Sequence, residues 1–210
     1  MEKVILPEVF HLYSEIKKKM DTSKIILVTG GARSGKSAFA ERYAAALPGR
    51  HAYVATARIF DEEMAQRIAI HRKRRPSSWQ TWEIPQDLPE TMERLCQSSD
   101  VVLVDCLTLY FSNYLFAHDG EDDEAIIDGA LAELQAVLAA FRQAGVTAVL
   151  VTNELGCGIV PMEHVSRLYR DLMGKINQAA AAEADEVYLS VCGITTELKH
   201  QAVCLPEVKS

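Results

Sequence analysis

The sequence has few cysteines and none of the cysteine patterns that mark disulfide-rich or zinc-binding proteins. Its 210 residues include five cysteines, which are widely spaced and never form a Cys-x-x-Cys pair. An odd number of cysteines at such spacings predicts neither a disulfide framework nor a zinc site. We therefore expect reduced thiols and a cytoplasmic location.

Long apolar runs and an excess of positive charge are also missing. No apolar stretch reaches the roughly 20 residues of a membrane-spanning helix, and the first 23 residues do not resemble a secretory signal, so we expect no membrane insertion. Lys and Arg total 22 against 29 Asp and Glu, a formal net charge of −7. This balance argues against nucleic acid as a partner, and an anionic ligand must be held by a local basic site.

The apolar residues that are present indicate an α/β fold. Short, β-branched-rich runs predict five strands that are buried on both faces: Ile25–Thr29, His51–Thr56, Val101–Asp105, Ala148–Thr152 and Glu186–Val191. Helical spacing of apolar residues predicts helices over Glu124–Gln143 and from about Met162 to Ala184. This alternation is typical of a doubly wound, mostly parallel sheet flanked by helices.

The chain divides into a short extension and one domain. We expect residues 24–210 to form a single α/β domain, in which residues 76–89 are a turn-rich connection. Residues 1–23 form an N-terminal extension, either an amphipathic helix that docks on the body or on another subunit, or a partly ordered segment.

The strongest chemical signal lies between the first strand and a helix. Gly30-Gly31-Ala32-Arg33-Ser34-Gly35-Lys36-Ser37 fits the phosphate-binding loop G-x-x-x-x-G-K-[ST], whose backbone N–H groups surround phosphate oxygens. Lys36 would contact the β- and γ-phosphates, while Ser37 and Asp105 would hold Mg²⁺. The alternatives are an accidental glycine-rich turn and, for Asp105, a helix cap or turn residue. The loop predicts a P-loop NTPase-like fold that binds nucleotide, without defining the reaction.

A histidine within a basic run is the second signal. His71 is followed by Arg72, Lys73, Arg74, Arg75 and a proline, at the end of a predicted helix with an acidic first turn. A neutral imidazole can attack phosphorus and form a covalent nucleotidyl intermediate. The adjacent cations would lower the pKa of His71 below its usual value of about 6.5 and stabilise charge on a triphosphate. A solvated basic helix end and a nucleic-acid or targeting segment are the alternatives.

These motifs, in their order, resemble the bifunctional adenosylcobinamide kinase/adenosylcobinamide-phosphate guanylyltransferase family of cobalamin biosynthesis. The similarity runs from about Lys24 to Lys199 and includes VTGGARSGKS, YVATARIFDEEMAQRIAIHRKRRP, VVLVDCLTLYFSN and VTNELGCGIVP. It implies phosphorylation of adenosylcobinamide with ATP or GTP, followed by transfer of GMP from GTP and release of pyrophosphate. It also implies a homotrimer.

The resemblance assigns roles to particular residues. It implies that residues 30–37 hold the triphosphate and that His71 is the guanylylated nucleophile. It adds to the nucleotide site Ala55, Thr56, Ala57, Arg72, Lys73, Arg74, Arg75, Glu83 and Asp105. From the residues alone Glu83 is an ordinary surface acid.

Three questions stay open at this point. Asn153, Glu154, Gly156 and Gly158 follow a strand end, so they could place substrate or simply permit a tight turn. Arg170, Asp171 and Asn177 could be packing and surface residues. The rival functions are a P-loop kinase for another small molecule, in which His71 is dispensable, and a nucleotide-dependent switch that acts through a protein partner.

Overall fold

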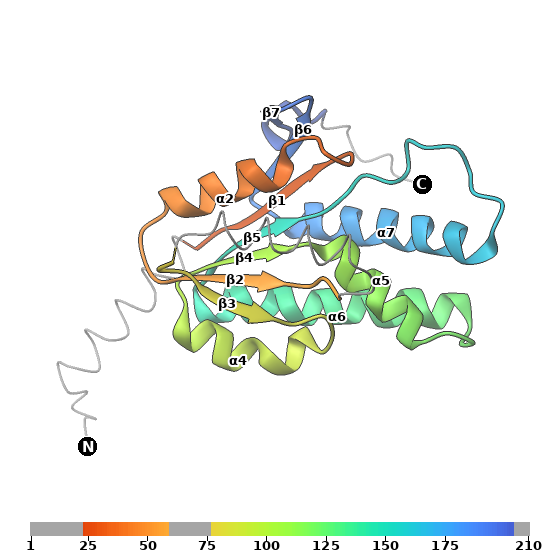
Figure 1. The fold of residues 1–210 in the computed structure, drawn as a ribbon, viewed down its shortest axis with the longest axis horizontal. Coiled ribbons are helices and arrows are strands. Elements are labelled where there is room, and N and C mark those ends of the chain that lie inside the picture. Colours follow the sequence, from red (N-terminus) through yellow and green to blue (C-terminus); the bar gives the residue numbers. More distant parts are fainter. Residues whose placement is uncertain (1–22, 59–76, 204–210) are drawn as a thin grey trace, which may run out of the picture.

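The computed structural model describes residues 23–58 and 77–203, which build a seven-stranded sheet with helices on both faces (Figure 1). The strands are β1 (Ile25–Gly30), β2 (His51–Ala55), β3 (Gln80–Glu83), β4 (Val101–Asp105), β5 (Thr147–Val151), β6 (Glu186–Val191) and β7 (Ile194–Glu197). The helices are α2 (Lys36–Ala46), α4 (Leu88–Ser98), α5 (Leu107–Ala117), α6 (Asp123–Ala144) and α7 (His164–Glu183), followed by a 3₁₀ turn over Lys199–Gln201.

The sheet is parallel except at one edge. Its strand order is β3-β2-β4-β5-β1-β6-β7, and only β7 runs antiparallel to its neighbour among these strands. All five predicted strands are present, and their bounds shift by at most one residue. The prediction of an α/β fold with a mostly parallel, doubly wound sheet is confirmed.

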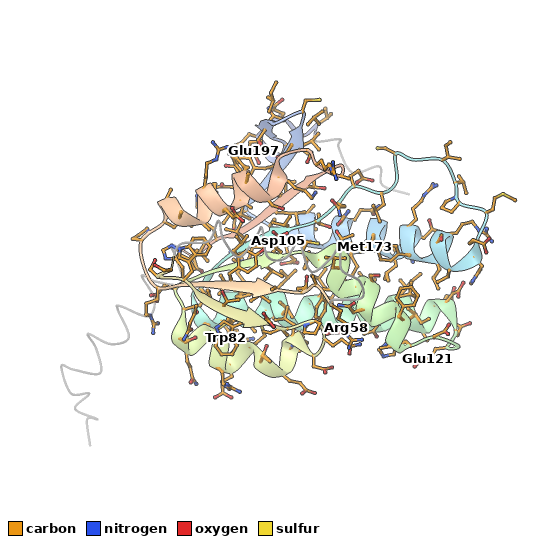
Figure 2. The ribbon with its side chains drawn as sticks, in the orientation of Figure 1. Arg58, Trp82, Asp105, Glu121, Met173 and Glu197 are labelled. Atoms are coloured by element: carbon orange, nitrogen blue, oxygen red, sulfur yellow. The ribbon has the colours of Figure 1, made fainter. Side chains whose placement is uncertain are left out.

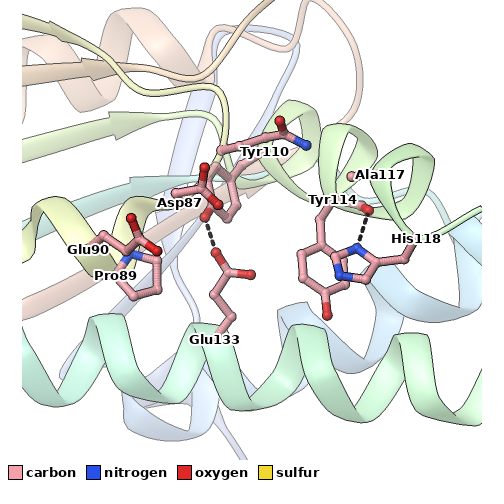
Figure 3. A pocket seen from close by; sticks show the side chains of 9 residues that line it. Asp87, Pro89, Glu90, Tyr110, Tyr114, Ala117, His118 and Glu133 are labelled. Carbon is pink, nitrogen blue, oxygen red and sulfur yellow. Dashed lines mark hydrogen bonds between the residues drawn. The ribbon is translucent and has the colours of Figure 1, made fainter.

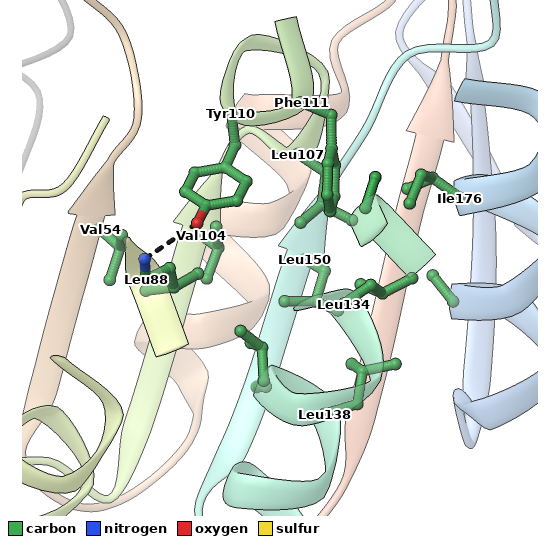
Figure 4. Close-up of a cluster of buried hydrophobic side chains, with 14 of the residues drawn as sticks. Val54, Leu88, Val104, Leu107, Tyr110, Phe111, Leu134, Leu138, Leu150 and Ile176 are labelled. Atoms are coloured by element: carbon green, nitrogen blue, oxygen red, sulfur yellow. Dashed lines mark hydrogen bonds between the residues drawn. The ribbon is translucent and has the colours of Figure 1, made fainter. Parts of the chain in front are cut away.

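Side-chain alternation along each strand divides the core into two layers. On one face, β-strand residues pack with Ala40 and Ala44 of α2. On the other face, residues such as Val54, Val104 and Leu150 pack with Leu134 of α6 and with the other helices α4, α5 and α7 (Figure 4). Burial on both faces explains why these strands are continuous apolar runs.

The predicted long helices are confirmed with small changes at their ends. In α6 the Asp122 side chain accepts hydrogen bonds from the N–H groups of Glu124 and Ala125, and left-handed Gly145 ends the helix. Helix α7 begins two residues later than expected, at His164. Among the described residues, no helix is both long and apolar enough to cross a membrane.

The prediction that residues 76–89 form a turn-rich connection is wrong in part, because this range contains β3 and the start of α4. Strand β3 is four residues long and mostly exposed at the sheet edge, so it has no apolar run that could reveal it. Its pairing with β2 defines it as a strand. Strand β7 was also missed; a two-residue turn with positive φ at Cys192 and Gly193 joins it to β6.

Candidate phosphate-binding site

The glycine-rich loop leaves the carboxyl end of β1 and enters α2, as the motif requires. Gly30, Arg33 and Gly35 have positive φ angles of 150°, 56° and 98°, so the backbone curls tightly before the helix begins. No side chain caps the start of α2 with a hydrogen bond. The first-turn N–H groups and the positive end of the helix therefore face the loop, an arrangement that suits a phosphate group.

Lys36 brings the positive charge that the overall composition lacks. The residue is 9% exposed, and its ammonium donates a hydrogen bond to the Gly31 carbonyl across the loop, with Nζ and O 3.2 Å apart. The ammonium is thus held over the curled backbone. This position matches the predicted role of contacting terminal phosphates.

The hairpin of β6 and β7 supports the loop from the side. The Gly193 N–H donates to the Ser34 carbonyl at 2.9 Å. A Cβ on Gly35 would lie 3.1 Å from Gly193 Cα, and a Cβ on Gly30 would lie 2.3 Å from the Ser190 carbonyl oxygen. Gly30 is therefore needed for close packing as well as for backbone curvature, Gly35 packs tightly against the hairpin, and sequence reasoning missed this support.

Asp105 is the last residue of β4 (Figure 2), and its hydrogen bond with Ser37 places it beside the start of α2. Its Oδ1 accepts a hydrogen bond from Ser37 Oγ at 3.4 Å, and its Oδ2 accepts one from the Tyr53 hydroxyl at 2.9 Å. The structure thus brings together the two residues that were predicted to hold Mg²⁺. Tyr53 is a contact that sequence reasoning missed.

Three predicted nucleotide-site residues lie in one row across the sheet edge. Ala55 of β2 is paired with Glu83 of β3 on one side and with Asp105 of β4 on the other. Glu83 is exposed at this edge. Its place as the last residue of a strand distinguishes it from its neighbours, but only knowledge of β3 could have provided that signal.

Thr56 and Ala57 directly follow β2, and the Thr56 side chain is used within the fold. The hydroxyl of this fully buried residue donates to the Cys106 carbonyl at 2.7 Å and accepts from the Cys106 N–H at 2.8 Å. Asn113 Nδ2 donates to the Thr56 carbonyl at 2.9 Å. Thr56 therefore ties the ends of β2 and β4 together and supports this edge from within, whereas Ala57, the next residue, is partly exposed.

The loop after β5 is joined to the phosphate-binding loop at its base. The Glu154 N–H donates to the Gly30 carbonyl at 3.2 Å. Asn177 of α7 accepts a hydrogen bond from the Thr152 hydroxyl at 2.7 Å and donates to the Asn153 carbonyl at 3.0 Å. Asn177 thus has a structural role, whereas the tip of the loop, which includes Gly156 and Gly158, is exposed.

A separate pocket of about 410 Å³ lies between α4, α5 and α6 (Figure 3). Its described lining contains Asp87, Glu90 and Glu133 together with Tyr110 and Tyr114, and no Lys or Arg. Burial raises the pKa of the Glu133 carboxyl, and the Tyr110 hydroxyl donates to that carboxyl. An acidic, aromatic lining does not suit a triphosphate, so the glycine-rich loop is the candidate site.

The remaining predicted site residues lie outside the described parts of the chain. These are His71, the predicted nucleophile, and the four cations that follow it, Arg72, Lys73, Arg74 and Arg75. The N-terminal extension, up to residue 22, also lies outside them.

Known proteins resemble this chain over most of its length. The model of the family described as cobinamide kinase/cobinamide phosphate guanyltransferase matches residues 26–198. The bifunctional adenosylcobalamin biosynthesis protein CobU of Escherichia coli is 44% identical over 184 residues, 83% of this chain and 99% of that protein. CobU of Salmonella typhimurium is 42% identical over 83% of this chain and 99% of its own length. The bifunctional adenosylcobalamin biosynthesis protein CobP of Pseudomonas aeruginosa is 42% identical, with coverages of 82% and 96%.

Proposed function

The chain belongs to the cobinamide kinase/cobinamide phosphate guanylyltransferase family. We propose which of its residues act in the kinase reaction, in guanylyl transfer, or in both. The enzyme phosphorylates the hydroxyl of adenosylcobinamide with ATP or GTP. It then transfers GMP from GTP to the new phosphate and releases pyrophosphate. The observation that supports the nucleotide site in this proposal is the meeting of Lys36, Ser37 and Asp105 around one curled loop.

The backbone of residues 30–37 binds the triphosphate in this proposal. Its N–H groups and the uncapped start of α2 attract the phosphate oxygens. Lys36 exchanges its bond to the Gly31 carbonyl for contacts with the β- and γ-phosphates and stabilises the charge that develops during transfer. Ala55, Ala57 and Glu83 line the nucleotide from the neighbouring strand ends, and fully buried Thr56 holds these ends in place.

Ser37 and Asp105 are the residues that would hold Mg²⁺. Their hydroxyl and carboxylate oxygens are the hard ligands that this ion prefers, and few protein ligands suffice when phosphate oxygens complete the set. Within residues 23–58 and 77–203, no group of three His, Cys, Asp or Glu side chains could hold a metal by itself. The ion, when bound, neutralises charge on the phosphates.

His71 is the nucleophile of the second reaction. Its imidazole nitrogen attacks the α-phosphorus of GTP, a nitrogen–phosphorus bond forms, and the bond to pyrophosphate breaks. An oxygen of cobinamide phosphate then attacks the same phosphorus and displaces the histidine. Arg72, Lys73, Arg74 and Arg75 stabilise the negative charge of the triphosphate during the first displacement.

The same proposal includes the location and the oligomeric state of the enzyme. We propose a cytoplasmic homotrimer, as the resemblance implies. Sedimentation equilibrium should then give three times the subunit mass of 23.3 kDa, whereas the mass of a single subunit would contradict it.

Labelling with GTP that carries radioactive phosphorus at the α-position tests the covalent step. We expect protein-bound label that is labile in acid and stable in alkali, and that is absent from His71→Ala. Binding of GTP to both proteins is measured in parallel. If wild-type protein binds GTP but takes up no label, or if His71→Ala is labelled equally, His71 is not the nucleophile.

A further inference from the structure

The Asp105 carboxylate has a hydrogen-bond partner, Tyr53, to which the sequence motifs and the family resemblance assign no role. The Tyr53 hydroxyl donates to Oδ2 at 2.9 Å, while Ser37 Oγ donates to the other oxygen, Oδ1, at 3.4 Å. One oxygen of the carboxylate thus faces the start of α2, and a phenol holds the other. The two oxygens are therefore not equivalent.

The parallel pairing of β2 with β4 produces this arrangement. Ala55 is paired with Asp105 and Tyr53 with Leu103, so Tyr53, Leu103 and Asp105 share one face of the sheet. The residues of the apolar layer on this face include Tyr53, Leu103 and Ala40 of α2. Tyr53 is only 2% exposed, so packing fixes the ring and directs its hydroxyl at the carboxylate.

We propose that Tyr53 is a positioning residue, which turns Asp105 so that Oδ1 stays available to a Mg²⁺ ion beside Ser37. The inference rests on the proposed metal role of Ser37 and Asp105. A hydrogen bond to the second oxygen of a ligating carboxylate orients the ligand and limits its rotation, and loss of such a bond lowers metal affinity by about 10- to 100-fold. Tyr53 touches neither the phosphates nor the ion in this arrangement.

Tyr53→Phe removes the hydroxyl and keeps the ring, so the apolar layer stays filled. The matched control is Tyr43→Phe, because it removes the same kind of bond at another place. Tyr43 lies in the body of α2, away from the loop, and its hydroxyl donates to a carboxylate oxygen of Glu186 in β6 at 2.6 Å. Thermal unfolding of both variants confirms that each is folded before binding is measured.

The measurement is the affinity of the full-length protein for a GTP analogue with a methylene bridge between the α- and β-phosphorus atoms, which prevents guanylyl transfer. Affinity is determined by calorimetry in EDTA and across a Mg²⁺ titration. We expect Tyr53→Phe to raise the Mg²⁺ concentration at the midpoint by roughly tenfold. Its affinity in EDTA should stay within about twofold of the wild type, and Tyr43→Phe should match the wild type in both conditions.

A third variant separates failure of this inference from failure of the proposed function. Asp105→Asn should raise the Mg²⁺ midpoint at least as far as Tyr53→Phe. If the wild type binds the analogue independently of Mg²⁺, or if Asp105→Asn retains the wild-type midpoint, the proposed metal site is wrong and the role of Tyr53 falls with it. If Asp105→Asn responds and Tyr53→Phe does not, only the positioning role is overturned. Equal loss of affinity with and without Mg²⁺ in Tyr53→Phe also overturns it, because the phenol would then support the loop in general.

Discussion

Replacing Gly30 by alanine tests whether the first glycine of the loop is required by packing against the β6–β7 hairpin. The added methyl group would lie 2.3 Å from the Ser190 carbonyl oxygen and 2.7 Å from Ser34 Oγ. Gly30 also has a φ angle of 150°, which residues with a side chain rarely adopt. Gly31, the next residue, is the matched control, because a Cβ there meets no atom within 4 Å.

Two costs add in Gly30→Ala. Overpacking in a close-packed region costs about 1 to 3 kcal/mol, and a sparsely populated backbone conformation adds about 1 kcal/mol or more. We expect the free energy of unfolding to fall by about 2 to 4 kcal/mol. In a chain of this size the melting temperature should fall by at least about 4 °C. Gly31→Ala should stay within about 0.5 kcal/mol of the wild type.

Urea unfolding followed by tryptophan fluorescence measures both variants, and a thermal scan checks the result. Wild-type stability of Gly30→Ala would refute the reasoning, because it would mean that the hairpin yields without cost. A loss in Gly31→Ala as large as that in Gly30→Ala would refute it too, since the loop would then respond to any added methyl group.

Other consequences of the structure can be measured in the same way. The backbone N–H of His200 is the main cause that lowers the pKa of Glu197 to about 2, below its ordinary value of 4.5. The stability that Glu197 contributes is therefore present above pH 4.5 and lost as the pH falls toward 2. Urea unfolding at a series of pH values should show the free energies of unfolding of wild type and Glu197→Gln converging in that window. A difference that stays constant with pH would contradict this. Asn177→Ala leaves a buried threonine hydroxyl without its acceptor, and we expect urea unfolding to give a loss of about 1 to 3 kcal/mol; no loss would show that the bond is dispensable. Burial raises the pKa of the Cys106 thiol to about 11, so peptide mapping after iodoacetamide treatment at pH 8 should find exposed Cys157 modified and Cys106 intact, and equal modification would refute this.

Sequence periodicity was sufficient for the interior of the fold and insufficient at its edges. The five central runs are apolar because both faces of each strand are covered, and this leaves a clear signal. Strand β3 is defined by its pairing with β2, and most of its residues are exposed. Strand β7 depends on a Cys192-Gly193 turn, which lacks the Asn or Asp that usually marks such a hairpin.

In the candidate site too, residues with a local sequence signal could be predicted, and those that depend on strand pairing could not. Gly30 to Ser37 could be predicted because each residue type has a local reason to stand in the motif. Asp105 could be predicted because it ends a buried run. Tyr53 could not, since its contact depends on the register of β2 against β4. The support from Gly193 likewise depends on the position of β6 beside β1.

The central claim is that one chain performs two transfers, with Lys36 needed for both and His71 only for the second. The most direct measurement incubates each protein with adenosylcobinamide, ATP, GTP and Mg²⁺ and separates the corrinoid products by chromatography. The wild type should yield the GDP derivative, His71→Ala should stop at adenosylcobinamide phosphate, and Lys36→Ala should form neither product. The account would be contradicted if His71→Ala formed the GDP derivative. It would also be contradicted if folded His71→Ala failed to form adenosylcobinamide phosphate.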